Sequence, residues 1–291
     1  MTVPFCFDAP DDGHPTDAMT MSFEVNGFCL LEGFADAADC DALTTRAQEM
    51  VAEFDPANAG VFSAAKGDGG HDEYFETSGD KIRCFLEEEA LDARGDLVTA
   101  KAGAVNKIGH ALHDLDDVFS DFSHGDRLAA LAAGLGLAEA RVLQSMFIFK
   151  SPRIGGEVSW HQDATYLHTE PECVTGFWFA LDDASEENGC LQVIPGGHKG
   201  PLRSLFYREG AELKYTVHDD TPLDASKVIH LPASKGDLVV FHGRLPHASA
   251  PNRSARSRHA YTLHAIDGTA EYPESNWLQR ADDMPLKGFG L

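Results

Sequence analysis

Basic residues, paired cysteines and long apolar runs are scarce in this sequence. Its 291 residues include 23 Lys and Arg against 47 Asp and Glu, a formal net charge of −24 with His neutral. Binding to nucleic acid without sequence preference, or to anionic membrane surfaces, needs a basic face, so the charge balance argues against both partners. No run approaches the roughly 18 apolar residues of a membrane span.

The six cysteines do not form a recognisable motif. They are scattered along the chain without a CxxC pair, which excludes the common zinc-finger and redox spacings. The first residues lack the basic segment followed by an apolar stretch that marks a signal peptide. These features predict reduced thiols in a cytoplasmic protein.

The domain organisation predicted from the sequence is simple. Residues 1–15 are rich in Asp and Pro, and we expect an irregular N-terminal arm there. A hydrophobic content of 43% supports a large core, and no repeat or low-complexity linker divides the rest of the chain. We therefore expect one domain over residues 16–291.

The pattern of secondary structure changes along the chain. In the first half, helical periodicity and capping residues predict helices at 17–26, 36–54, 104–115 and 127–137, with a short strand at 28–31 and a loop at 55–80. Later runs with strand character occupy 141–150, 174–181, 189–194, 236–242 and 258–266. Because helices precede strands without βαβ alternation, we predict an α+β, mainly β fold with a jelly-roll core.

Two histidines and one aspartate carry the first chemical signal. His161 and Asp163 are two residues apart, so on a strand their side chains point to the same face. A single such pair is weak evidence in a chain with 14 His. His247 follows a second apolar strand, and two His with one carboxylate form the facial triad of non-haem Fe(II) oxygenases.

Arg258 opens the last predicted strand. A guanidinium inside a barrel can bind a carboxylate through two parallel hydrogen bonds, as the distal carboxylate of 2-oxoglutarate requires. On its own, Arg258 would be read as one of three exposed arginines, with Arg253 and Arg256. The triad upstream favours the binding role.

Three segments resemble the phytanoyl-CoA dioxygenase family of Fe(II)/2-oxoglutarate oxygenases. They are 160–163 (WHQD), 188–198 (NGCLQVIPGGH, with Gly where the family has Ser) and 247–258, within a similarity that spans about residues 16–278. The resemblance implies a double-stranded β-helix with buttressing helices. It also implies iron ligands at His161, Asp163 and His247, and a 2-oxoglutarate clamp at Arg258.

Five further residues acquire roles from this resemblance. Ser249 and Lys107 would contact 2-oxoglutarate, and Lys107 would add positive charge for a dianion. Met146 and Trp178 would line its pocket, although both residue types are also common in plain cores. Gln162 would lie near the substrate.

Asp163 also separates two chemistries. Related halogenases carry Gly or Ala at this position, so Asp163 favours hydroxylation. We expect a dioxygenase that uses Fe(II), 2-oxoglutarate and O₂, releases succinate and CO₂, and hydroxylates a small organic substrate. A non-catalytic sensor of metal and 2-oxoglutarate, and a cupin-like isomerase or dioxygenase that does not need 2-oxoglutarate, stay open as alternatives. The remaining histidines, such as His110, are expected to be structural, with His242 and His264 on predicted strands as candidates to support a metal ligand.

Overall fold

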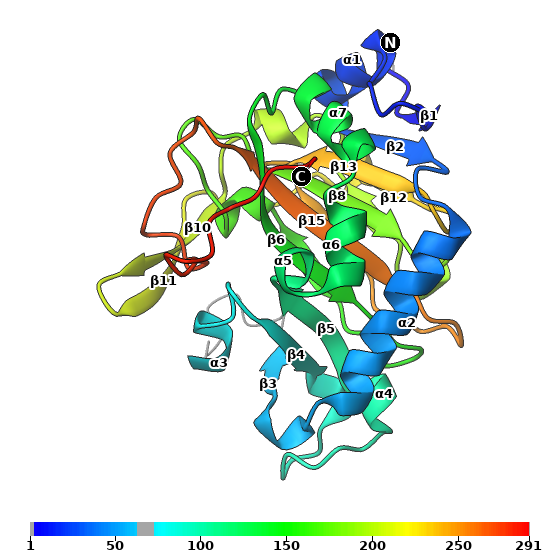
Figure 1. The fold of residues 1–291 in the computed structure, drawn as a ribbon, viewed down its shortest axis with the longest axis vertical. Coiled ribbons are helices and arrows are strands. Elements are labelled where there is room, and N and C mark those ends of the chain that lie inside the picture. The colour runs from blue at the N-terminus through cyan, green and yellow to red at the C-terminus, as the bar shows by residue number, and fades with distance from the viewer. Residues whose placement is uncertain (1–2, 63–72, 291) are drawn as a thin grey trace.

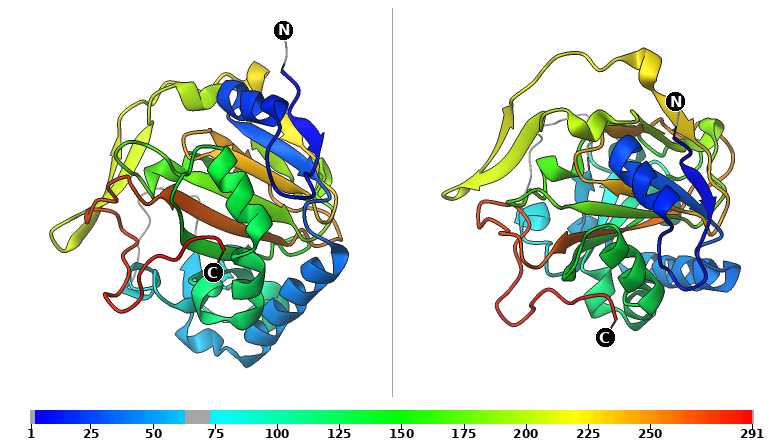
Figure 2. Two further views of the ribbon diagram at one scale, coloured as in Figure 1. Left: turned by 45° about the horizontal axis from the view of Figure 1, so that its top comes forward. Right: turned by 90° about the horizontal axis from the view of Figure 1, so that it is seen from above.

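The architecture is two facing β-sheets with helices on the outer side of the larger one (Figure 1). The computed structural model describes residues 3–62 and 73–290. Seen from above, helices α2 (Ala37–Glu53), α6 (Asp117–Ser123) and α7 (Asp126–Gly134) lie on one side of the large sheet, and the hairpin lies on the other (Figure 2). This arrangement is the predicted jelly-roll core with buttressing helices.

The large sheet has nine strands in the order β1-β2-β13-β8-β15-β6-β5-β4-β3. Their bounds are β1 Cys6–Asp8, β2 Phe28–Glu32, β3 Gly60–Phe62, β4 Ile82–Glu87, β5 Val105–His110, β6 Ala140–Ile148, β8 Thr175–Ala180, β13 Leu238–His242 and β15 Ala260–Asp267. The strands in its centre, from β2 to β4, pair antiparallel. All five later strands predicted from the sequence are present, four of them in this sheet.

The small sheet faces the centre of the large one and has the order β12-β9-β14-β7. Its strands are β7 Val158–His161, β9 Leu191–Val193, β12 Ile229–Leu231 and β14 His247–Ser249. A separate hairpin follows from β10 Ser204–Glu209 and β11 Glu212–Val217.

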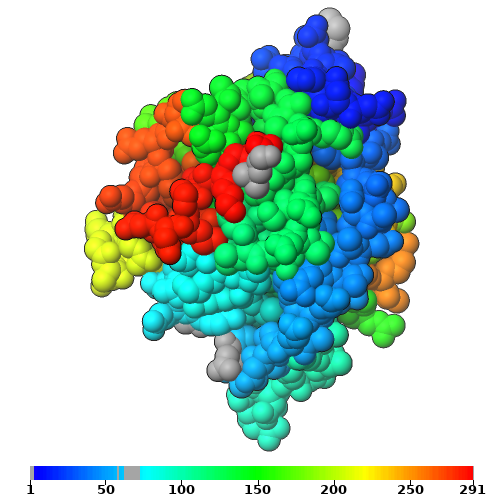
Figure 3. All heavy atoms as spheres, in the orientation of Figure 1, coloured from blue at the N-terminus to red at the C-terminus, as the bar shows by residue number. Residues whose placement is uncertain are grey.

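The helices are α1 Asp17–Asn26, α2 Ala37–Glu53, α3 Glu73–Glu76, α4 Lys101–Ala104, α5 Leu112–Leu115, α6 Asp117–Ser123 and α7 Asp126–Gly134. Helix α1 confirms its predicted ends: the Thr16 hydroxyl accepts a hydrogen bond from the Met19 amide, and Gly27 has the left-handed φ of 86° that ends many helices. Helices α2, α6 and α7 cover one face of the molecule, with the C-terminal segment beside them (Figure 3). None of the helices in the described part of the chain has the length and apolarity needed to cross a membrane.

The predicted helix at 104–115 is wrong. Most of this segment is strand β5, which pairs with β4 and β6, and only short helical turns flank it. Its fully buried apolar residues Val105, Ile108 and Leu112 have helical spacing, so the pattern suited either structure. The two neighbouring strands decided the outcome, because pairing in a sheet overrides local propensity.

Two predicted irregular segments also contain regular structure. Within residues 1–15, Cys6–Asp8 form β1, which pairs in parallel with β2, and Phe5 packs on Phe28 with 5.2 Å between ring centroids. Within residues 55–80, β3 and α3 are present, while residues 63–72 lie outside the described part. Contacts with distant strands stabilise these short elements, which carry too little local pattern to be predicted.

Alternation along β15 separates the core from the cavity. Tyr261, Leu263 and Ala265 belong to the core between the large sheet and the helices. Thr262 and His264 point the other way and line a cavity between the two sheets. Apolar side chains on this inner side include a buried cluster with Trp178, Leu191 and Phe241.

Candidate active site

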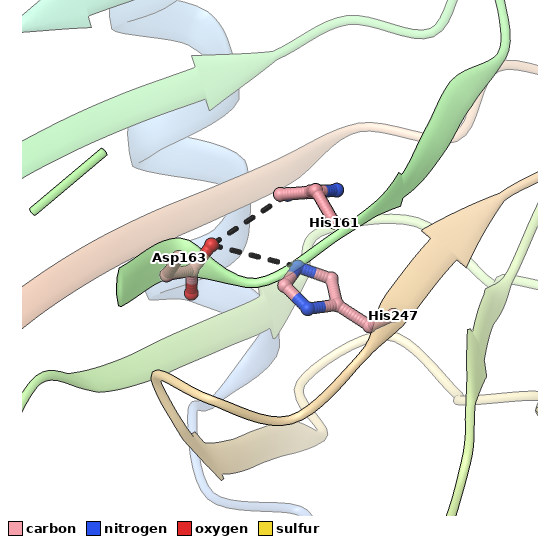
Figure 4. Close-up of side chains that lie close together, drawn as sticks. All are labelled: His161, Asp163 and His247. Atoms are coloured by element: carbon pink, nitrogen blue, oxygen red, sulfur yellow. Dashed lines mark ion pairs between the residues drawn. The ribbon is translucent and has the colours of Figure 1, made fainter. Parts of the chain in front are cut away.

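Three potential metal ligands converge on the wall of this cavity. His161 ends β7, Asp163 begins the following 3-10 turn, and His247 begins β14 opposite His161 in the antiparallel ladder. The Asp163 Oδ1 atom lies 3.6 Å from Nε2 of His161 and 3.6 Å from Nε2 of His247 (Figure 4). One donor atom from each residue lies within 4.8 Å of the others, which suits a single ion.

Both histidines present the correct nitrogen for a metal. Nδ1 of His161 lies 2.8 Å from the Ser159 carbonyl oxygen, and Nδ1 of His247 lies 3.0 Å from that of Leu245. A carbonyl only accepts, so each Nδ1 carries the hydrogen and each Nε2 has a free lone pair. Burial lowers the pKa of His247 to about 4, which keeps this imidazole neutral at pH 7.

His264 orients the carboxylate of Asp163. Its Nε2 atom lies 3.1 Å from Oδ2, which leaves Oδ1 directed at the two histidine ligands. Burial by itself would raise the pKa of Asp163, but His264 and His247 outweigh it and hold the pKa well below its usual range. The structure thus places His264 directly against the triad.

The cavity has a volume of about 200 Å³ and brings the triad together with five of the other sequence-predicted residues. These are Lys107, Met146, Trp178, Ser249 and Arg258. The predicted site is therefore assembled from β5, β6, β8, β14 and the segment before β15.

Arg258 is a buried cation with unused hydrogen-bond donors. It is 1% exposed, and its Nε and Nη1 atoms have no hydrogen-bond partner among the described residues. Its guanidinium carbon lies 5.4 Å from the ring centroid of Trp178. Burial lowers its pKa to about 10, so it stays charged at pH 7. A desolvated charge of this kind is costly unless an anion binds it, so the geometry suits a carboxylate.

Lys150 is a second buried basic residue at this end, and sequence reasoning missed it. Its Nζ donates to Ser249 Oγ at 2.9 Å and to the Gly156 carbonyl at 2.8 Å. Burial, helped by the charge of Arg258, lowers its pKa to about 6. In the sequence it is merely the polar end of a predicted strand, and its importance follows from its position just after β6, from which its side chain reaches Ser249 of β14.

Lys107 lies further along the same wall, on β5. It is 7% exposed and its Nζ sits 5.5 Å from the ring centroid of Phe85 and 5.9 Å from that of Phe75. Burial lowers its pKa to about 7. An anion bound nearby would therefore favour its charged form.

Gln162 does not line the cavity, contrary to its predicted place near the substrate. It follows His161 on an extended backbone, so its side chain points to the opposite face. Its Nε2 donates to the carbonyls of Arg244 at 2.7 Å and Pro201 at 3.2 Å, and its Oε1 accepts from the Arg203 amide at 2.8 Å. The side chain is 1% exposed and ties the segment after β9 to the sheet.

The opposite end of the cavity is aromatic. Phe75 from α3 and Trp277 from the C-terminal segment stack with 4.2 Å between ring centroids, and His110 at the end of β5 packs against both. The three residues are far apart in the sequence. Phe75 lies in a segment predicted to be a loop, and His110 was expected to have a structural role.

The comparison with known proteins decides the family. The model of the phytanoyl-CoA dioxygenase (PhyH) family matches residues 23–260. The chain belongs to the phytanoyl-CoA dioxygenase family. It is 42% identical over 272 residues to phytanoyl-CoA dioxygenase 1 of Oryza sativa subsp. japonica, covering 93% of this chain and 96% of that protein. It is also 42% identical over 276 residues to phytanoyl-CoA dioxygenase domain-containing protein 1 of Bos taurus, covering 91% and 94%.

This phytanoyl-CoA dioxygenase family member shares its fold with solved non-haem enzymes. The epimerase SnoN, solved in complex with Fe³⁺, alpha ketoglutarate and nogalamycin RO, superposes with a TM-score of 0.63. The match has 18% sequence identity and covers 93% of each chain. The likeness confirms the predicted jelly-roll architecture.

Proposed function

We propose that this chain is an Fe(II)- and 2-oxoglutarate-dependent dioxygenase that hydroxylates a small organic substrate and releases succinate and CO₂. The observation that carries the proposal is the presence, in one cavity, of the metal-ligand triad and the buried guanidinium of Arg258, whose Nε and Nη1 atoms have no hydrogen-bond partner in the described part of the chain. The names of its relatives and its fold support the same chemistry. We keep the cytoplasm as its predicted location.

Each residue has a defined part in this proposal. His161, Asp163 and His247 would hold Fe(II) through one donor atom each. Arg258 binds the distal carboxylate of 2-oxoglutarate. When bound, the iron with 2-oxoglutarate and O₂ supplies the oxidising chemistry.

The other lining residues shape the cosubstrate site. Ser249 offers a hydroxyl two residues after His247, with its orientation held by Lys150. Lys107 supplies a second positive charge once an anion is near. Met146 and Trp178 form apolar walls that exclude water from the reacting atoms.

Within this proposal, hydroxylation is favoured over halogenation. Asp163 occupies the position that a halogenase leaves open for halide, which argues against halogenation. Epimerisation, the activity named for SnoN, uses the same kind of centre, and a product analysis separates it from hydroxylation. A non-catalytic sensor would bind the same ligands without turnover.

The test is succinate formation by the purified protein with Fe(II), 2-oxoglutarate and O₂, first alone and then with a panel of small substrates. We expect slow formation alone and faster formation with a substrate, whose product contains one added oxygen. Binding of Fe(II) and 2-oxoglutarate without any succinate would favour the sensor. A product of unchanged composition would favour epimerisation.

A further inference from the structure

His110 is a fully buried polar residue at the aromatic end of the cavity that neither metal nor 2-oxoglutarate binding uses. Its ring meets Phe75 edge to face at 5.8 Å and Trp277 at 5.2 Å between centroids. It also lines the cavity. His110 therefore borders the part of the cavity that a ligand would occupy at this end.

The hydrogen bonds around Ser78 determine the tautomer of His110. The Ser78 hydroxyl lies 2.5 Å from the Phe75 carbonyl oxygen and 2.8 Å from Nδ1 of His110. A hydroxyl has one hydrogen, and the carbonyl can only accept it, so the hydroxyl oxygen accepts from Nδ1–H. Burial, helped by the charge of Lys107, lowers the pKa of His110 well below its ordinary value, so the ring is neutral. Nε2 is then an acceptor with a free lone pair.

Two buried nitrogens at this end lack a partner. Within the described residues, neither Nε2 of His110 nor Nε1 of Trp277 makes a hydrogen bond. The first is an acceptor and the second can only donate. Buried polar groups are almost always satisfied, so this complementary pair marks a place where a ligand supplies the missing partners.

We propose that the aromatic end binds the substrate through a neutral hydroxyl or primary amide group, which donates to His110 Nε2 and accepts from Trp277 Nε1. This inference rests on the proposed function, in which 2-oxoglutarate occupies the Arg258 end. A carboxylate at the aromatic end would meet the lone pair of His110 without a hydrogen to donate. The cavity of about 200 Å³ also lies below the roughly 300–1,000 Å³ of ordinary ligand pockets, so only a compact group fits beside the cosubstrate.

The test compares two probes of similar size in protein loaded with Mn(II) and 2-oxoglutarate, where no turnover is needed. The alcohol 1-phenylethanol donates and accepts, whereas the ketone acetophenone only accepts. Because one hydrogen bond is gained, we expect the alcohol to bind about three- to tenfold more tightly. Equal affinities, or no binding of the alcohol, would overturn the proposal.

Variants assign the preference to His110. His110→Phe should abolish the preference for the alcohol, while His230→Phe, at an exposed strand position, should keep it. Ser78→Ala leaves the ring in place but removes the acceptor of Nδ1–H, so the preference should shrink as the other tautomer becomes accessible. An unchanged preference in both His110→Phe and Ser78→Ala would contradict the assignment.

A spectroscopic readout separates recognition from packing. With ¹⁵N-labelled histidine, the Nε2 resonance of His110 should report an unprotonated nitrogen and shift on addition of the alcohol but not of the ketone. An Nε2 that carries hydrogen, or does not respond to the alcohol, would refute the inference. Failure of the succinate assay alone would instead refute the proposed function, because neither probe experiment depends on turnover.

Discussion

The two ends of the cavity differ in the kind of unsatisfied group that they present. At one end, Arg258 offers charged donors that only an anion satisfies, with Lys150 beside it. At the other, His110 offers a neutral acceptor and Trp277 a neutral donor among aromatic rings, and Lys107 lies 5.9 Å from the Phe75 ring there. The metal triad lies on the wall that both share. The Arg258 end thus suits the charged cosubstrate, and the His110 and Trp277 nitrogens suit a neutral group of the substrate.

The largest effect is expected from the triad, on which both ends depend. Asp163→Ala removes the oxygen that faces both histidines, so we expect succinate formation to fall to background and stoichiometric Fe(II) binding to be lost. Metal content after dialysis and succinate release measure the two effects. The control is Asp183→Ala, on the loop after β8. Turnover by Asp163→Ala comparable with that of the unaltered protein would remove Asp163 from the metal site.

Arg258→Ala should break the cationic end alone. Truncating one partner of a buried charge pair costs about 2–5 kcal/mol, so we expect the dissociation constant of 2-oxoglutarate to rise at least about 30-fold. Isothermal calorimetry with Mn(II) in the metal site measures it. Arg256→Ala, two residues away and exposed, should leave the constant unchanged. The proposed difference between the ends would fail if Arg258→Ala abolished the preference for 1-phenylethanol but not 2-oxoglutarate binding.

His264 links the large sheet to the metal site, and its loss should have an intermediate effect. Removing a partner that orients a metal ligand typically lowers metal affinity by about 10–100-fold, which we expect for His264→Phe. His264→Gln keeps an amide near the position of Nε2 and should recover most of the affinity. Fe(II) competition with a chromophoric chelator measures both. Equal affinities for the two variants would mean that the 3.1 Å contact with Asp163 does not orient the carboxylate.

Site residues that belong to a short sequence motif could be predicted, whereas those whose role depends on the order of strands in the sheet could not. His161 and Asp163 share a face because strand side chains alternate, and a short motif carries that spacing. Arg258 and His247 come from the same local resemblance. Lys150 and His264 were missed or left open because their roles depend on which strands are neighbours, and the order β8-β15-β6-β5 is not written in any local pattern.

The aromatic end was less predictable still. Phe75, His110 and Trp277 come from three segments that meet only in the folded chain. The segment with His110 was predicted as a helix, since its apolar spacing fits both structures. Without β5 in place, His110 could not be assigned to the cavity. Local motifs thus predicted the metal side of the cavity better than its aromatic end.

The smallest effect is expected from Lys150, whose buried amine makes the free energy of unfolding depend on pH when no anion is bound. The pKa of Lys150 is lowered to about 6 in the folded protein, from an ordinary value near 10.5 in the unfolded chain. Between these values the unfolded chain binds more protons, so this residue makes stability rise with pH, by up to about 1.4 kcal/mol per pH unit. Lys150→Met should therefore flatten the rise in unfolding free energy between pH 7 and 9, measured by urea titration without 2-oxoglutarate. Lys227→Met, with 65% of its side chain exposed, should leave the slope unchanged. An unaltered slope in Lys150→Met would show that Lys150 is already charged in the folded protein. The cationic end would then carry two full charges, those of Arg258 and Lys150, before an anion binds.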